Sequence, residues 1–187
     1  TGHLVLSTLH TNDSVSTIMR LLDLGVDPVA LAASLRGVLA QRLVKRLHGT
    51  PSKKPATRLE RDWLLANRLH DYVDKPFGYP EEHSSYQGML PIMELLLISP
   101  AIQEAIVHRQ DKRIRQIAGT QPQFETLAKA GTRLAASGLT SLAEIIAISG
   151  QSAQATQMPL GERLISLGYL TSFQLGKALN RQISGSP

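Results

Sequence analysis

An apolar run near the start of the chain is the strongest constraint on its fold. Residues 3–9 read HLVLSTL, a short and partly β-branched run that begins with a histidine and is followed by a second one. The pattern has no polar alternation and is typical of a strand buried on both faces, as in a parallel sheet covered by helices. We therefore expect an α/β fold in which residues 3–9 form an inner strand.

Capping and turn residues predict the two elements that follow this run. Asp13 begins a helix that reaches about Leu24 and stops at Gly25. Asp27 and Pro28 are the expected N-cap and first residue of a second helix. This second helix is expected to continue through VALAASLRGVLAQRL, after which VKRLHG leaves it as a strand.

The middle and the later part of the chain alternate between loops and regular elements. Residues 48–57 form a loop by composition, and residues 74–88 are also expected to be irregular. A strand is predicted at MLPIMELLLIS, with Pro91 at an edge or bulge. One helix is predicted from Arg58 to about Tyr72, and another opens at Ser99 and Pro100 and runs through Arg109. Two more are predicted over 123–137, where Gly138 ends the helix, and over 141–149, where Ser141 and Glu144 form a capping box.

The last part of the chain is expected to be a separate helical unit. Residues 150–157, GQSAQATQ, are small and polar without apolar periodicity, and we interpret them as a linker. Residues 158–187 then form a small helical unit. The predicted organisation is thus an α/β part over residues 1–149 that becomes mostly helical, a linker, and a helical C-terminal unit.

Composition restricts the class of protein. Of the 187 residues 42% are apolar, which indicates a globular fold, and the absence of cysteine excludes disulfides and thiolate metal sites. The net charge of +5 fits either an ordinary basic surface or an anionic partner such as a nucleotide, a nucleic acid or lipid headgroups. Aromatic residues are not interleaved with the basic residues, as a surface that binds single strands would require, so we expect no nucleic-acid partner. The sequence shows no signal peptide and no run long enough to span a membrane.

Three polar residues follow the apolar run where a ligand is expected. His10, Thr11 and Asn12 lie at the carboxyl end of the predicted strand, and in parallel sheets ligands bind beyond that end. An imidazole, a hydroxyl and an amide suit phosphate oxygens or an attacking water. His3 lies seven strand steps away, roughly 23 Å in a straight strand, so the two histidines cannot both contact one phosphate. The alternative is a core strand with polar ends.

The segment TGHLVLSTLHTN resembles the His box of the secretion ATPase family. Its members are the hexameric motors of type II secretion and type IV pilus assembly, including proteins similar to general secretion pathway protein E. The resemblance covers roughly residues 1–149 and continues through RLLDLGVDPVALAASLRGVLAQRLVKRL, YQGMLPIMELLLIS and GLTSLAEII.

This resemblance implies the C-terminal part of a RecA-like P-loop ATPase domain. ATP and Mg²⁺ are cofactors of the intact family motor, whose P-loop, acidic box and Walker B strand precede the His box. GxxxxGK[ST] does not occur in the 187 residues, so we expect the chain alone neither to bind these cofactors tightly nor to hydrolyse ATP. The earlier strands of the sheet are expected on residues outside this chain. The alternative is a non-catalytic module that docks on the motor and regulates it.

The resemblance also implies partners and roles. The expected partners are other subunits of a homo-hexamer and the inner-membrane platform and cytoplasmic adaptor proteins of a secretion or pilus system. The expected location is the cytoplasm, peripheral to the bacterial inner membrane. Within the His box we expect His10, more than His3, to act on the nucleotide, with Thr11 and Asn12 beside it.

Two further features depart from family motifs. Many members hold zinc with two CxxC pairs, but here those places read KRLHGTPSKK and GYPEEHSSY. His48, Glu82 and His83 could still provide ligands, although a metal-free hairpin is expected.

The segment PLGERLISLGYLTSFQLGKALNRQ resembles a motif that binds cyclic di-GMP in the N-terminal domain of some of these ATPases. Pro159 stands where that motif has arginine, so we expect no tight binding, and packing of a leucine core is the alternative. The matching residues are Leu160, Gly161, Leu164, Gly168, Leu170, Leu175, Leu179 and Gln182.

Overall fold

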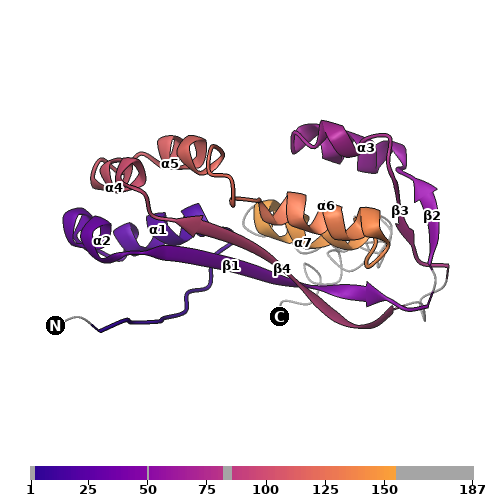
Figure 1. Cartoon of the computed structure of the whole chain (residues 1–187), viewed down its shortest axis with the longest axis horizontal. Helices are drawn as coiled ribbons and strands as arrows, with labels where there is room; N and C mark the ends of the chain where they lie inside the picture. Colours follow the sequence, from indigo (N-terminus) through magenta and orange to yellow (C-terminus); the bar gives the residue numbers. More distant parts are fainter. Residues whose placement is uncertain (1–2, 50, 82–85, 155–187) are drawn as a thin grey trace, which may run out of the picture. The chain divides into compact units, whose positions relative to one another are not determined.

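The computed structural model describes residues 3–49, 51–81 and 86–154. The chain divides into two compact units, Thr1–Ser149 and Gly150–Pro187, and most of the described residues belong to the first. The described residues form a mixed α/β structure (Figure 1). In chain order its elements are α1 (Ser14–Asp23), α2 (Pro28–Ser34), β1 (Gly37–Leu47), β2 (Ser52–Pro55), α3 (Arg58–Ala66), a short 3₁₀ helix η1 (His70–Tyr72), β3 (Pro76–Tyr79), β4 (Tyr86–Leu97), α4 (Pro100–Val107), α5 (Asp111–Ala118), α6 (Leu127–Ser137) and α7 (Leu142–Gln154).

The strands pair in two antiparallel ribbons. β1 pairs with β4 from Gly37 opposite Leu97 to Leu47 opposite Tyr86, with an irregularity after Lys45. β2 pairs with β3 in a shorter ribbon. The strand predicted at 89–99 is confirmed, but no parallel pair occurs among the described strands.

The prediction that residues 3–9 form a buried strand is wrong for this structure. The segment is irregular, and Leu4, Val5 and Leu6 are 81%, 79% and 88% exposed. An apolar run becomes a buried strand only when other strands pair with it and helices cover it. Within the described residues the strands pair with one another, and residues 3–9 have no strand beside them.

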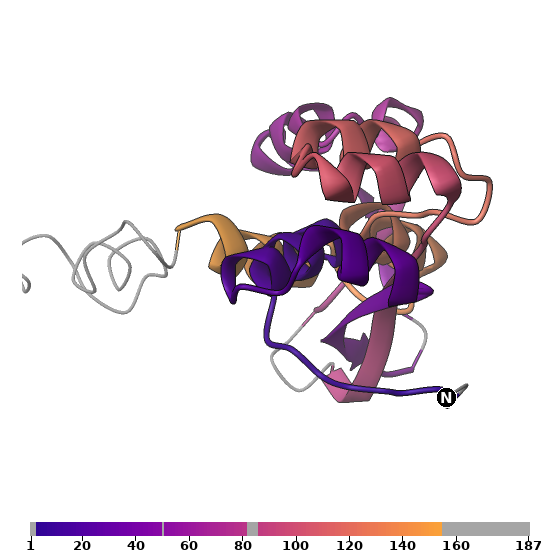
Figure 2. The ribbon, with the colours of Figure 1, turned by 90° about the vertical axis from the view of Figure 1, so that its left-hand side faces the viewer.

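Two hydrophobic cores share the long ribbon of β1 and β4. The first core gathers α1, α2, α4 and α5 against Val38 and Leu96. The second gathers α3, β3, α6 and α7 against Val44 and Ile92. Figures 1 and 2 show α1 to α6 on one side of the ribbon, in agreement with the alternating burial along both strands.

Several predicted helix boundaries are confirmed. Asp13 caps α1 by accepting from the Ser16 amide at 2.7 Å, and Asp27 caps α2. Gly25 has a φ of +88°, and Gly138 ends α6 in the left-handed region at +86°. Ser99 caps α4, which begins at Pro100 as the sequence indicates.

The second predicted helix is wrong over 37–43, which lie in β1. α2 ends at Ser34, because Leu35 is already extended, with ψ at 130°. From Gly37 onward alternate side chains are buried: Val38 and Ala40 face the core. Leu, Ala, Gln and Arg favour a helix locally, but pairing with β4 overrides that weak preference.

Smaller differences concern the loops and the later helices. The strand β2 lies inside the loop predicted at 48–57, and the strand β3 lies inside the stretch predicted to be irregular at 74–88. The helix predicted to end near Tyr72 ends at Ala66 and is followed by η1, and α5 is an element that the sequence patterns did not indicate. At the start of α7 Ser141 accepts from the Glu144 amide at 3.2 Å, but the Glu144 carboxylate turns to Lys45 Nζ at 3.1 Å.

The predicted linker is partly helical, because α7 continues to Gln154. Alanine and glutamine are good helix formers, so a small polar stretch can extend a helix that apolar residues have begun. Residues 155–157 and the predicted helical unit at 158–187 lie outside the described residues. No helix among the described residues is long and apolar enough to cross a membrane.

Candidate functional site

The segment that leads into α1 is held against the ribbon by hydrogen bonds. Arg42 on β1 donates from Nη2 to the Thr11 carbonyl at 2.9 Å and to Asn12 Oδ1 at 3.3 Å. The Thr11 hydroxyl lies 2.7 Å from the Thr17 hydroxyl on α1. Residues 11 and 12 are therefore held in place, although the apolar residues before them are exposed.

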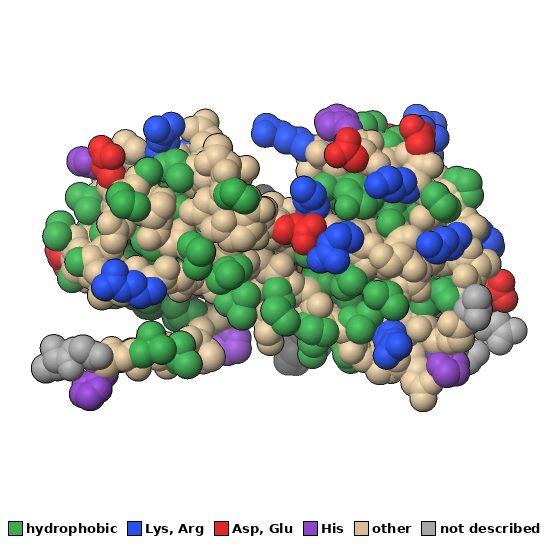
Figure 3. Space-filling view, in the orientation of Figure 1, with side chains coloured by type: hydrophobic (Ala, Val, Ile, Leu, Met, Phe, Trp, Pro, Cys, Tyr) green, Lys and Arg blue, Asp and Glu red, His purple; other side chains and the backbone are tan. Residues whose placement is uncertain are grey.

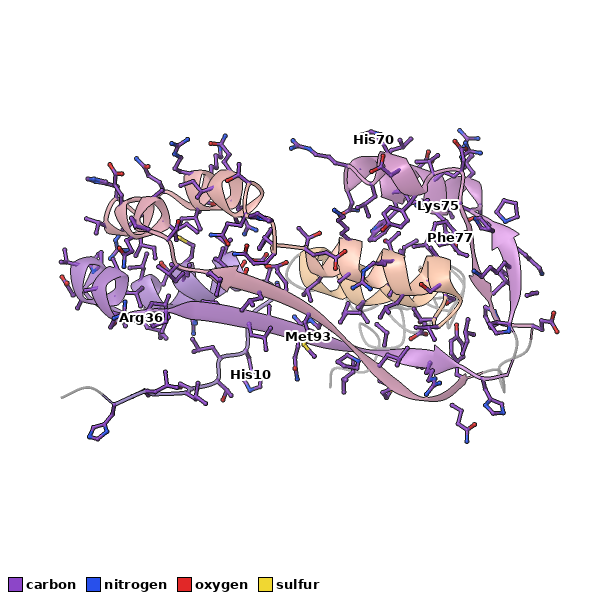
Figure 4. The ribbon with its side chains drawn as sticks, viewed as in Figure 1. His10, Arg36, His70, Lys75, Phe77 and Met93 are labelled. Carbon is purple, nitrogen blue, oxygen red and sulfur yellow. The ribbon has the colours of Figure 1, made fainter. Side chains whose placement is uncertain are left out.

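A pocket of about 450 Å³ lies where this segment meets α1 and α5. It is lined by His10, Thr11, Asn12, Ser16, Met19, Arg20, Asp23, Asp111 and Arg115. Three of the four residues predicted from the His box are thus brought together, and Figure 4 shows His10 on the segment below β1. His3 is exposed and is not among the residues that line this pocket.

Charged side chains from two helices surround the polar end of the pocket. Arg115 on α5 lies 3.3 Å from the Asp13 carboxylate and donates to the Ser16 hydroxyl at 3.4 Å. The Arg115 side chain is 48% exposed, so solvent weakens this ion pair and leaves the guanidinium accessible. With Arg20, in the last turn of α1, it provides two cations that line the pocket, an arrangement that suits phosphate oxygens.

Sequence reasoning missed the contribution of α5 to this pocket. Asp111 and Arg115 lie about one hundred positions after His10 in the chain. The available signal was the segment DKRIRQIA, in which Ile114 and Ala118 repeat at helical spacing. That signal predicts a helix, but nothing in it indicates which earlier residues the helix meets.

A buried carboxylate close to the pocket was also missed. Glu94 on β4 is only 4% exposed, and both of its oxygens accept hydrogen bonds. Oε1 accepts from the Ser14 amide at 2.9 Å and from the Ser14 hydroxyl, and Oε2 accepts from the Leu127 amide at 3.2 Å. The available signal was a single glutamate inside the apolar run MLPIMELLLIS.

The remaining candidate residues stay predictions. Among residues 3–49, 51–81 and 86–154, no group of three His, Asp or Glu side chains is placed to hold a metal ion. His48 is exposed, whereas Glu82 and His83 lie outside the described residues. The residues of the cyclic di-GMP-like motif, from Leu160 to Gln182, lie outside them too.

Comparison with known proteins identifies the family. The family model described as "Type II/IV secretion system protein" matches residues 1–147. The chain is 36% identical to the type II secretion system protein E of Klebsiella pneumoniae over 81% of its own length and 30% of that protein's. It is 35% identical to the type II secretion system ATPase E of Vibrio cholerae, covering 81% of this chain and 31% of the relative.

A pilus protein is similar to the same part of the chain. The type IV pilus assembly ATPase PilB of Acinetobacter baylyi is 33% identical over 81% of this chain and 27% of its own length. The chain thus spans about a third or less of the length of these relatives. From the matched region and these identities, the chain is a partial member of the type II secretion and type IV pilus ATPase family.

Proposed function

We propose that this chain supplies the phosphate-facing His box of a hexameric ATPase that powers type II secretion or type IV pilus assembly. The observation that carries the proposal is the pocket in which His10, Thr11 and Asn12 meet Arg20 and Arg115. A histidine, a hydroxyl and two guanidinium groups form a donor set for phosphate oxygens. In this role the chain works with a nucleotide-binding half that carries the P-loop and with the membrane platform and adaptor of its system.

The geometry supports a sensing role for His10. Its imidazole can hydrogen-bond a terminal phosphate or orient the attacking water. It lies three residues before Asp13, which caps α1 and is paired with Arg115. A phosphate that attracts Arg115 competes with Asp13 for the guanidinium, so its arrival or loss changes the forces on the first turn of α1. His3, exposed and away from the pocket lining, has no comparable connection.

We assign the binding of Mg²⁺ and of the β- and γ-phosphates to the half that carries the P-loop, and not to this chain. Mg²⁺ would screen the charge of the phosphates and polarise them when bound. The described residues offer no three-ligand metal site, so we assign the ion no ligands here. The sequence also has no P-loop lysine to hold the β- and γ-phosphates. We therefore expect the purified chain to bind phosphate weakly and to release none from ATP.

A phosphate titration tests the role of the pocket. Inorganic phosphate added to the ¹⁵N-labelled chain should shift the His10 side-chain and Ser16 amide resonances with a saturable, millimolar response. His10→Ala should weaken that response, and His3→Ala, the matched control, should leave it unchanged. In a hexamer that joins this chain to a P-loop half, His10→Ala should lower turnover by about 10² or more, the usual range for a group that handles the attacking water or its proton.

Two results would contradict the assignment. One is a response to phosphate that is lost in His3→Ala but retained in His10→Ala. The other is a hexamer that keeps full turnover without the His10 imidazole. ATP hydrolysis by the isolated chain that survives repeated purification would contradict the expected division of labour between the two halves.

A second candidate function, a non-catalytic module that docks on the motor, is favoured by a different observation. The outward face of β1 and β4 carries six apolar side chains that are 40–55% exposed, and Figure 3 shows apolar side chains in the middle of this view. They are Leu39, Leu43, Met89, Met93, Leu95 and Leu97. The two candidates are distinguished by whether the chain supports ATP turnover when combined with a P-loop half.

A further inference from the structure

Polar residues separate the two cores on the shared ribbon. Along β4, Ile92 belongs to the second core and Leu96 to the first, and the buried side chain between them on the same face is Glu94. On β1, Arg42 lies between Val38 of the first core and Val44 of the second. The His box is attached at this polar boundary, because Arg42 holds its Thr11 carbonyl.

Glu94 joins one helix of each core. The Ser14 amide and hydroxyl, at the start of α1, bond to Oε1, and the Leu127 amide, at the start of α6, bonds to Oε2. Both amides belong to the first residue of their helix, where main-chain N–H groups have no partner within the helix. One carboxylate thereby faces the positive ends of two helix dipoles.

This arrangement is specific to a carboxylate of the right length. Burial of a charged group is costly unless every oxygen is hydrogen-bonded, and here both oxygens are. A glutamine would present an NH₂ group to one of the donors. An aspartate is one methylene shorter and could reach only one helix. The site therefore depends on α1 and α6 keeping their present separation.

We propose that Glu94 is a positioning residue that couples the His-box pocket to α6. α1 carries Ser16 and Arg20 of the pocket, and Asp13 at its cap is paired with Arg115. A shift of the first turn of α1 changes the Ser14 bonds to Glu94 and, through the second oxygen, the bond to Leu127. A role of this coupling in a motor rests on the phosphate binding proposed above, but the structural coupling between α1 and α6 does not require phosphate.

Native-state hydrogen exchange of the full chain tests the coupling. Arg115→Gln removes the ion pair with Asp13 at the pocket and leaves both helices intact. We expect it to speed exchange of the Ser16 amide and, if Glu94 transmits the change, to speed exchange of the Leu127 amide by about five-fold or more, the lower end of typical coupling between sites. In a Glu94→Gln background the same Arg115→Gln change should leave Leu127 exchange unaltered.

Matched variants make the result decisive. Glu104→Gln changes an exposed glutamate on α4 and should preserve the response at Leu127. Ser14→Ala removes only the hydroxyl bond, so it should reduce the response while keeping the fold, and it replaces Glu94→Gln if that variant does not fold. The proposal is overturned if Arg115→Gln speeds exchange at Ser16 but not at Leu127, or if the response at Leu127 is unchanged by Ser14→Ala and Glu94→Gln. The hydrogen-exchange experiment uses no phosphate, so its outcome does not depend on whether the phosphate titration succeeds or fails.

Discussion

Arg42 and Glu94 lie on neighbouring strands at the boundary between the two cores, and each bonds to main-chain atoms. Arg42 donates to the Thr11 carbonyl, and Glu94 accepts from the amides of Ser14 and Leu127. Opposite charges on paired strands would ordinarily be read as an ion pair. Here they anchor the segment that leads into α1 and the first residues of two helices, so each charged side chain positions main-chain atoms.

Tyr86 links β4 to the start of α7 and should make stability depend on pH in the alkaline range. Burial raises the pKa of Tyr86 above its ordinary 10.0; the Ser141 hydrogen bond opposes the shift, Glu144 adds to it and Lys45 opposes it. A raised pKa in the folded state means that the neutral phenol stabilises the fold below pH 10. That contribution is lost as the pH rises through the folded-state pKa.

The measurement compares the wild-type chain with Tyr86→Phe, which cannot ionise. Urea midpoints taken between about pH 8 and pH 11 should show the wild-type chain losing stability relative to the phenylalanine variant above pH 10. The other tyrosines and the lysines are common to both proteins, so their titration cancels in the difference. A stability difference that stays constant across this range would show that Tyr86 has the same pKa in the folded and the unfolded state.

At the scale of elements, several helix starts and the strand β4 were predictable, but α5 and most of β1 were not. Asp13, Asp27 and Ser99 each precede a helix in the sequence and each caps one in the structure. A cap acts within a few residues, so local sequence contains the whole signal. β1 depends on pairing with a strand about fifty residues later, and its Leu, Ala, Gln and Arg residues point locally to a helix.

The residues of the candidate site also divide into those that local sequence predicts and those that only the fold brings together. His10, Thr11 and Asn12 were predicted because they follow one apolar run, and the structure places all three at the pocket. Arg115 and Glu94 come from distant elements, and only the folded arrangement brings them near α1. Their individual patterns, a basic helix and a glutamate in a strand, carry no information about which neighbour they meet.

Gly78 makes the contact between β3 and the turn before α7 unusually close. A Cβ at this position would lie 2.7 Å from the Thr140 carbonyl oxygen and 2.9 Å from Gly138 Cα, both main-chain atoms. Main-chain atoms cannot move aside without displacing the turn. We expect Gly78→Ala to lower the free energy of unfolding by about 1–3 kcal/mol, the usual cost of overpacking.

Gly119→Ala provides the matched control for this prediction. Gly119 follows α5 with a φ of −61°, and a Cβ there would have no neighbour nearer than 3.5 Å. Chemical denaturation should place this variant within about 0.5 kcal/mol of the wild-type chain. Equal effects of the two substitutions would mean that the loss of glycine, and not the close contact, sets the stability.

At the scale of the molecule, the sequence did not predict two cores on one ribbon. Apolar periodicity shows that a residue is buried, but Val38 and Val44 give the same signal although they belong to different cores. The exposure of Leu4, Val5 and Leu6 was equally unpredictable, since burial of that run depends on which strands lie beside it. Mixed α/β composition was predictable, whereas the antiparallel pairing was not.

The cyclic di-GMP-like motif yields a prediction for the whole chain. The family motif that residues 159–182 resemble is expected to begin with arginine, and Pro159 cannot supply the guanidinium that pairs with phosphate or guanine. We expect calorimetric titration of the chain with cyclic di-GMP to show no binding tighter than about 1 μM, equivalent to roughly −8 kcal/mol.

Pro159→Arg separates the two explanations for weak binding. If the missing guanidinium is the cause, this variant should bind measurably more tightly than the wild-type chain. Unchanged weak binding would instead favour the leucine-core interpretation of the motif. Submicromolar binding by the wild-type chain would contradict the prediction itself.

The main-chain donors to Glu94 also decide which positions can drift during evolution. An amide hydrogen is present in every residue except proline, so position 127 can accept nearly any side chain and still bond to Oε2. The one excluded residue is proline, which is otherwise favoured at the first position of a helix. Descendants of this sequence should therefore exclude proline at 127, where the side chain also packs against the second core. They should vary less at 14, where a hydroxyl also donates, and least at 94, where a single carboxylate serves two helices.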